Sequence, residues 1–155
     1  MLYFKTITFP DDVTQHQIET ALRKSAIKKT TVLDFQKSVI DVNRDKDFLG
    51  FESKKSLSFT RTKTSLEFML PKLIINLPKD ELATSYKIRL SAVPFTICLI
   101  LSMGILTAFV GLLKGTYIFE EMSPVFVGAM LFFLLLMLEL KITNARIVKS
   151  INNSV

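Results

Sequence analysis

Oxygen-bearing side chains gather in one segment, DVNRDKDFLGFE, which runs from Asp41 to Glu52. Asp41, Asn43 and Asp45 stand at alternate positions, and Glu52 closes the segment. Carboxylate and amide oxygens are the ligands that hard divalent cations such as Ca²⁺ prefer. The segment is therefore a candidate metal site of calcium type.

The spacing resembles an EF-hand loop, in which positions 1, 3, 5 and 12 carry ligands. Phe48 stands at the position that is apolar in that loop. The sixth position is Lys46, whereas the sharp turn of that loop needs glycine. The flanking sequences also look like strands and not like paired helices. The alternative is a polar turn between two strands, since Asn and Asp stabilise turns.

A second kind of chemistry is suggested by four basic residues that follow this segment, namely Lys54, Lys55, Arg61 and Lys63. A basic side chain close to an anionic leaflet gains about 1 kcal/mol. The row is a candidate contact for anionic lipid or for an anionic ligand such as a nucleotide, and the alternative is a solvated sheet face. We expect no nucleic acid as a partner, because the net charge of +6 is modest. In addition, the hydroxyl residues at the even positions of the segment 51–65 have no aromatic residues interleaved among them on that face.

Catalytic patterns are missing from the sequence. It has no G-x-S-x-G, no Walker loop and no glycine-rich phosphate turn. A single histidine, His16, and a single cysteine, Cys98, provide neither a Cys-His pair nor a four-ligand zinc site. Carboxylate chemistry at Asp45 and Asp47 is the remaining enzymatic alternative. We expect no catalytic residues, no enzyme activity and no cofactor.

Two uncharged runs dominate the C-terminal part of the chain. Residues 90–113 form a run of 24 and residues 122–138 a run of 17, which as helices span about 36 Å and about 26 Å against a hydrocarbon core of roughly 30 Å. Neither has the polar face of a soluble helix. We predict a transmembrane hairpin over 90–140, with spans 90–113 and 122–140, a loop at 114–121 and Glu139 close to the interface.

Basic residues near the two runs predict the orientation. Three precede the first run and three follow the second, while the loop holds Lys114 alone; the six are Lys79, Lys87, Arg89, Lys141, Arg146 and Lys149. Both termini should therefore be cytoplasmic and the loop should face outward. Small membrane chains of this kind are common in bacteria, so we expect a multi-pass protein of the bacterial inner membrane.

Small residues recur along the predicted hairpin, at Gly104, Ala108, Gly111, Gly115 and Gly128. The first four are spaced to share one helical face, and such seams let helix backbones approach closely. One interpretation is packing between the two spans of one chain. The other is self-association of several hairpins.

Residues 1–89 carry most of the charge, 16 Lys/Arg against 11 Asp/Glu, and predict a small cytoplasmic α+β domain. We expect one helix over 10–29 and four to five mainly antiparallel strands, within 2–9, 30–42 (with helix as an alternative), 51–65, 66–78 and 85–90. Alternation in 51–65 predicts a strand with one hydroxyl-lined face. Residues 141–155 are expected to be a short cytoplasmic tail. The expected core includes Phe4, Phe35, Phe59 and Phe68.

These features predict a membrane-anchored binding or regulatory subunit. Its cytoplasmic domain would recognise a partner or a small anionic ligand, and the hairpin would hold it in the lipid bilayer. The alternative is an oligomeric membrane-perturbing effector assembled through the small-residue seam. The expected partners are the bilayer and either another protein or further copies of the chain.

Overall fold

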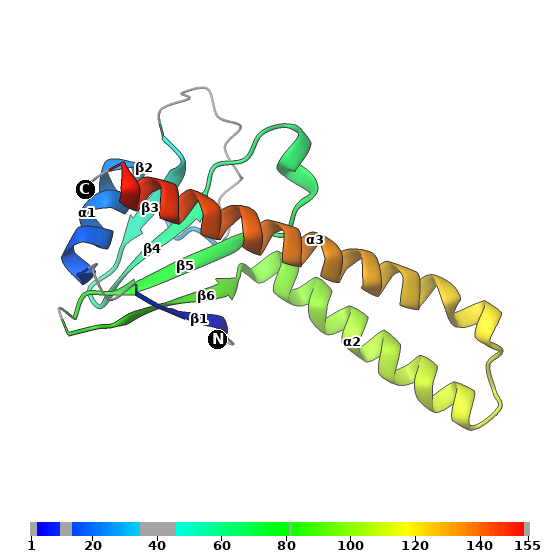
Figure 1. The fold of residues 1–155 in the computed structure, drawn as a ribbon. Helices are drawn as coiled ribbons and strands as arrows, with labels where there is room; N and C mark the ends of the chain where they lie inside the picture. Colours follow the sequence, from blue (N-terminus) through cyan, green and yellow to red (C-terminus); the bar gives the residue numbers. More distant parts are fainter. Residues whose placement is uncertain (1–2, 10–13, 35–45, 81, 154–155) are drawn as a thin grey trace.

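The computed structural model describes residues 3–9, 14–34, 46–80 and 82–153 of the 155-residue chain. Six strands and a helix form an N-terminal domain, from which two long apolar helices project as a hairpin (Figure 1). The predicted α+β class with a helical hairpin is confirmed. The sheet has six strands instead of four to five.

The sheet is almost entirely antiparallel, in the order β1-β6-β5-β4-β3-β2, with β2 and β3 paired in parallel. Its strands are β1 Tyr3–Thr8, β2 Ala26–Lys29, β3 Phe48–Glu52, β4 Ser56–Arg61, β5 Leu73–Pro78 and β6 Ser85–Leu90. The helices are α1 Gln15–Lys24, α2 Ala92–Leu113 and α3 Phe119–Asn152, with a short 3-10 helix, η1, at Leu66–Met69.

The first helix is shorter than predicted because a local hydrogen-bond motif sets its start. The Thr14 hydroxyl accepts from the Gln17 backbone N–H, and the Gln17 side chain accepts from the Thr14 N–H, which together form a capping box. After Ser25 the chain pairs with β3 as β2. Residues 26–29 therefore belong to the sheet and not to the helix.

The central strands also differ from the prediction in their limits. A turn at residues 53–55 divides the segment 51–65 between β3 and β4. Pro71 breaks the segment 66–78, so that η1 precedes it and β5 follows. Residues 30–34 are not a strand, and 35–42 lie outside the described residues. Of the expected core residues, Phe59 is buried, Phe68 is exposed, and the side chains of Phe4 and Phe35 lie outside the description.

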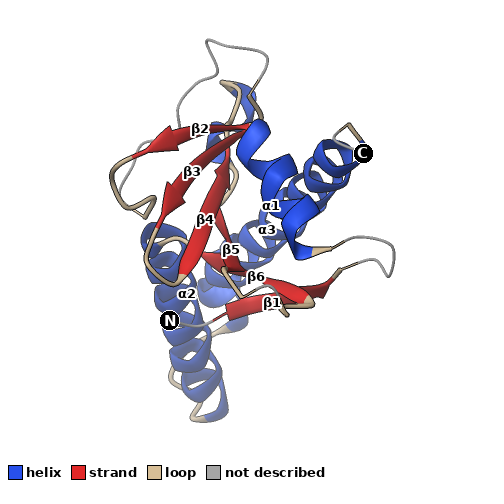
Figure 2. Ribbon diagram, turned by 90° about the vertical axis from the view of Figure 1, so that its left-hand side faces the viewer, coloured by secondary structure: helices blue, strands red, loops and turns tan. Residues whose placement is uncertain are grey.

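The main core lies between one face of the sheet and the helices α1 and α3, which share that side (Figure 2). Strand alternation sends every second side chain to this face. Its buried members include Ile18 and Leu22 of α1, Leu57, Phe59, Ile75, Leu77, Tyr86 and Ile88 of the sheet, and Leu136, Leu140, Ile147 and Ile151 of α3. A smaller cluster on the opposite face consists of Leu33, Leu49 and Ile74.

One helix belongs to both the hairpin and the domain. α3 runs without a break for 34 residues, a length of about 51 Å, and its last turns pack on α1 and the sheet (Figure 1). The expected tail at 141–155 is therefore helical as far as Asn152, and Thr143, Ile147 and Ile151 within it are buried.

The helices α2 and α3 are each long and apolar enough to span a membrane. Only 11% of the most apolar window of α2 and 22% of that of α3 is buried. A hairpin inside a soluble protein would bury such surface, so this exposure favours helices that lie in a bilayer. These features are those of a membrane protein with two candidate transmembrane helices.

Part of the small-residue seam contacts the chain itself. Ala108 and Gly111 are buried. A Cβ added to Gly111 would lie 1.9 Å from Cδ2 of Tyr117, and one added to Gly104 would lie 3.4 Å from Cγ1 of Val125. These three positions therefore pack within one hairpin.

The remaining seam glycines have other surroundings. Gly115 has φ of +68°, a left-handed conformation that glycine adopts without strain, and it ends α2 instead of extending the seam. A Cβ added to Gly128 would meet nothing within 4 Å.

Candidate functional site

A buried ion pair joins the hairpin to the domain. Arg61 lies at the end of β4 and Glu139 lies in the middle of α3. The Arg61 Nη2 donates to Oε2 of Glu139 at 2.6 Å and its Nε donates to Oε1 at 3.3 Å. Both side chains are only 1% exposed. Such a bidentate pair fixes the relative position of the two elements, because two parallel hydrogen bonds constrain distance and angle together.

Further charges surround this pair. Nζ of Lys63 lies 4.0 Å from Oε1 of Glu139. The Arg61 Nη1 also donates to Glu67 at 2.7 Å, and Arg146 of α3 forms an ion pair with Asp47, just before β3. The network links β4, the segment that contains η1 and the last half of α3. We call this network the junction cluster; its members are Arg61, Lys63, Glu67, Glu139, Arg146 and Asp47.

The pKa of Glu67 reflects its place in the junction cluster. Burial acts to raise the pKa of this carboxyl, but hydrogen bonds from the Thr64 backbone N–H and from Arg61 outweigh it and lower the pKa to about 2. Because the folded pKa lies below the ordinary value of 4.5, the stabilisation by Glu67 is present above pH 4.5 and disappears as the pH falls toward 2.

Glu67→Gln should therefore lower the free energy of unfolding at pH 7 by about 1.5–3 kcal/mol, the usual contribution of a charge-assisted hydrogen bond. The difference from the unmodified protein should shrink between pH 4.5 and pH 2. Denaturant unfolding in detergent micelles, followed by circular dichroism across this range, measures it. Glu120→Gln, in the exposed first turn of α3, is the control, and a difference for Glu67→Gln that does not vary with pH would contradict the assignment.

A second buried ion pair holds the start of α2. Arg89, near the end of β6, donates to both oxygens of Asp34 at 2.7 Å. This bonding is the main reason that the pKa of Asp34 is lowered. The same carboxylate accepts from the Ala92 N–H at 3.2 Å, whereas Ser91 at the N-cap makes no side-chain cap. Asp34 therefore acts as an N-terminal cap supplied from another part of the chain.

Between these two ion pairs lies a groove with a volume of about 470 Å³, at the base of the hairpin. Its apolar wall comes from the helices, and its polar end comes from the domain. The helices contribute Val93, Pro94, Ile97, Phe132 and Leu135, and the domain contributes Asp34, Lys63 and Lys72 together with Phe68, Met69, Leu70 and Pro71. We call it the membrane-proximal groove. Its size is within the usual range for ligand sites, about 300–1,000 Å³.

A second hollow, of about 430 Å³, lies at the other end of the sheet. Because Leu57, Ile75 and Tyr86 point toward α1 and α3, alternation puts the hollow's strand residues on the opposite face. Its lining residues are Lys55, Ser56, Asn76, Pro78, Asp80, Ala83, Ser85 and Lys87. We call it the distal hollow. The hollow holds two ammonium groups against one carboxylate, Asp80, and this excess of positive charge, with hydroxyl and amide donors, suits an anionic ligand.

The predicted basic row is divided between the two ends of β4. Lys54 and Lys55 are exposed in the turn before the strand, whereas Arg61 and Lys63 are only 2% exposed at the junction cluster. A strand of six residues spans about 20 Å, which separates the two pairs. A single solvated row is thus wrong for Arg61 and Lys63, while Lys55 lines the distal hollow and Lys63 lines the membrane-proximal groove.

Three of the four candidate calcium ligands, Asp41, Asn43 and Asp45, lie outside the described residues. The fourth, Glu52, accepts from Arg23 at 3.1 Å and from Lys79 at 2.8 Å, and these bonds lower its pKa to about 2. Within the described ranges no group of three or more His, Cys, Asp or Glu can hold a metal ion. Calcium binding stays a prediction.

The two single residues with reactive side chains lie apart. His16 is exposed on α1. Cys98 is half-buried on α2 and packs against the main core. Sequence reasoning missed the pairing of Glu139 with Arg61, although a lone carboxylate directly after 17 uncharged residues was the available signal.

Comparison with protein-family models, with curated proteins and with solved structures finds no match to this chain. The class that the fold and the sites define is a two-helix membrane hairpin bearing a sheet domain with a polar hollow.

Proposed function

We propose that the protein is a membrane-anchored binding or regulatory subunit. The hairpin crosses the bilayer with both termini in the cytoplasm, and the sheet domain recognises a partner or a small anionic ligand. The observation that carries this proposal is the distal hollow, which brings Lys55 and Lys87 together with Ser56, Asn76 and Ser85 on the face opposite α1 and α3.

Strand register explains how the hollow is built. β5 and β6 pair so that Asn76 lies opposite Lys87, and β4 and β5 pair so that Ser58 lies opposite Asn76. The Ser58 hydroxyl donates to Oδ1 of Asn76 at 2.7 Å. Polar groups are therefore held in order across three neighbouring strands, which is the pre-organisation that a ligand site needs.

The position of the hollow also supports a binding role. β6 leads directly into α2 at its Leu90 end, whereas Ser85 stands at its opposite end. The hollow thus lies at the end of the sheet away from the hairpin, where it faces the cytoplasm in the proposed orientation. A ligand or partner reaches it without approaching the bilayer.

The effector alternative depends on the small-residue seam being available to other copies. Gly104, Ala108 and Gly111 are instead in contact with their own chain. This arrangement favours an anchor over an assembling hairpin.

The proposal is tested with two adjacent lysines. Lys54 and Lys55 are both exposed, but only Lys55 lines the hollow. Titration calorimetry of the full chain in detergent uses pyrophosphate and a nucleoside triphosphate as anionic probes, and affinity capture from detergent-solubilised membranes covers protein partners. We expect Lys55→Glu to weaken binding at least tenfold and Lys54→Glu to change it less than threefold.

Equal losses in both variants mean that binding reflects general surface charge, and the distal hollow is then not the site. If neither the probes nor captured proteins bind the unmodified chain, the binding role is wrong.

A further inference from the structure

We propose that the membrane-proximal groove binds the headgroup of an anionic phospholipid from the leaflet that the hairpin enters. This inference concerns a second site, with residues other than those of the distal hollow, and it does not depend on the function proposed above. The ligand is a lipid and not a free anion, because one wall of the groove is made of the membrane helices themselves.

The depth of the groove matches the headgroup region. Pro94 and Ile97 lie in the first turns of α2, and Phe132 and Leu135 precede Glu139 in α3. These residues lie where the apolar parts of the two helices meet the domain. A lipid whose phosphate lies at the polar end of the groove would place its acyl chains along this wall.

Charge also favours an anion here. Among the described residues, five cations and four carboxylates stand around the groove and the junction cluster: Arg61, Lys63, Lys72, Arg89 and Arg146, and Asp34, Asp47, Glu67 and Glu139. The sum is one positive charge. The carboxylates are held by arginines, and the two cations that line the groove itself are Lys63 and Lys72.

The two lysines are held in position by backbone groups. Nζ of Lys63 donates to the Leu70 carbonyl and Nζ of Lys72 donates to the Leu33 carbonyl. Burial lowers the pKa of Lys72 to about 8, since water is partly excluded from its ammonium group. Asp34 acts in the opposite direction on this pKa, and a headgroup phosphate would add a further negative charge beside the partly dehydrated ammonium group.

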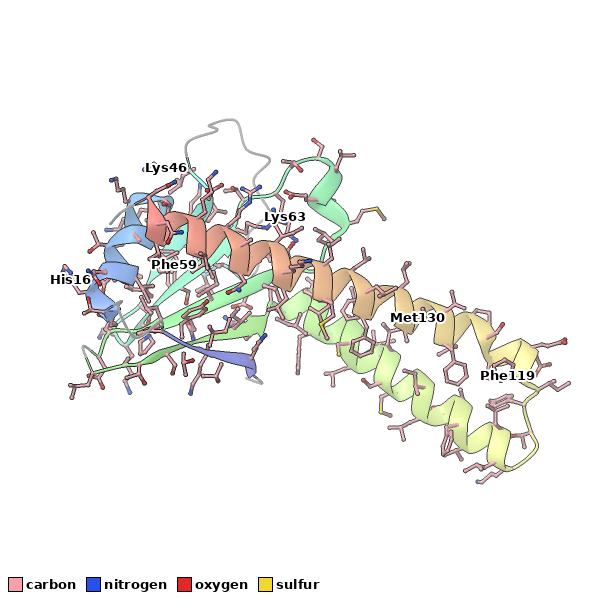
Figure 3. All side chains as sticks on the ribbon, viewed as in Figure 1. His16, Lys46, Phe59, Lys63, Phe119 and Met130 are labelled. Carbon is pink, nitrogen blue, oxygen red and sulfur yellow. The ribbon has the colours of Figure 1, made fainter. Side chains whose placement is uncertain are left out.

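Beside the groove, η1 presents apolar side chains to solvent. Leu66 is 94% exposed, Phe68 63% and Met69 83%, and the last two line the groove. Figure 3 labels Lys63 at the base of the hairpin, with Met130 and Phe119 progressively farther out along α3. Exposed apolar side chains at this level are typical of segments that enter the membrane interface. η1 therefore forms the outer rim of the lipid site.

The test uses the full chain purified in a mild detergent and native mass spectrometry with added phosphatidylglycerol or phosphatidylcholine. We expect phosphatidylglycerol to be retained at least fivefold better. Lys72→Gln should remove most of this preference. Lys54→Gln, which changes an exposed lysine away from the groove, should leave it intact, and circular dichroism checks that both variants fold.

Two additional measurements distinguish a lipid from a free phosphate. Inorganic phosphate at millimolar concentration should not displace the bound lipid, and full displacement would overturn the proposal in favour of a soluble anion. The chain has no tryptophan, so Phe68→Trp gives a single tryptophan, whose fluorescence brominated phosphatidylglycerol in vesicles should quench. No quenching, no preference between the two lipids, or equal losses for Lys72→Gln and Lys54→Gln would each overturn it.

Discussion

Glu139→Ala is expected to lower the free energy of unfolding by about 3–5 kcal/mol, the usual cost of removing one partner of a buried ion pair. The substitution leaves Arg61, whose side chain is 1% exposed, without its bidentate partner, and it removes the carboxylate that lies 4.0 Å from Nζ of Lys63. Chemical denaturation in detergent micelles, followed by circular dichroism, measures the change. Glu120→Ala, in the exposed first turn of α3, should be close to neutral.

The double substitution Arg61→Met with Glu139→Leu separates loss of charge from loss of fit. Replacing both members of a buried pair by apolar residues of similar size is often neutral or stabilising. We therefore expect the double variant to recover most of the stability lost in Glu139→Ala. If Glu139→Ala changes stability by less than 1 kcal/mol, the junction cluster does not hold the hairpin to the domain.

Lys141→Pro is expected to have the second large effect, because α3 is continuous through the junction. Lys141 is exposed, so its replacement removes no buried side chain. Proline takes away the N–H that bonds to the carbonyl four residues earlier and clashes with that carbonyl, at a cost of about 3 kcal/mol or more. The helix should break between the apolar half and the half that packs on the sheet.

The matched control is Lys141→Ala, which keeps the backbone N–H and the helix. Limited proteolysis in micelles should cut Lys141→Pro near residue 141 at least tenfold faster than the control, and denaturation should show the loss of stability. Equal cleavage and equal stability of the two variants would mean that α3 does not couple the hairpin to the domain.

Local patterns in the sequence predicted the features that depend on local physics. A run of 24 uncharged residues is a membrane-length signal in itself, and α2 is found at Ala92–Leu113. Alternation in the segment around Phe59 likewise predicted a strand with one hydroxyl face, and Leu57 and Phe59 are buried while Ser58 bonds across the opposite face. These signals need no knowledge of distant residues.

The features that were missed depend on pairs far apart in the chain. Arg61 and Glu139 are separated by 78 positions, and Asp34 and Arg89 by 55. Nothing local distinguishes a lysine or arginine that will be buried by such a pairing from one in a solvated row. The predicted helix over 10–29 includes the residues of β2 for a related reason. This short strand is stabilised by pairing with β3, and the local sequence does not show that pairing.

The claim that the hairpin crosses the bilayer, with the sheet domain in the cytoplasm, is tested most directly by determining on which side of the membrane each end of the molecule lies. With Cys98 replaced by serine, single cysteines are introduced at Glu120, in the first turn of α3, and at Lys54, in the turn before β4. A membrane-impermeant maleimide is applied to intact and to permeabilised cells. We predict that Glu120→Cys reacts in intact cells and that Lys54→Cys reacts only after permeabilisation; reaction of both from the same side would contradict the proposed topology.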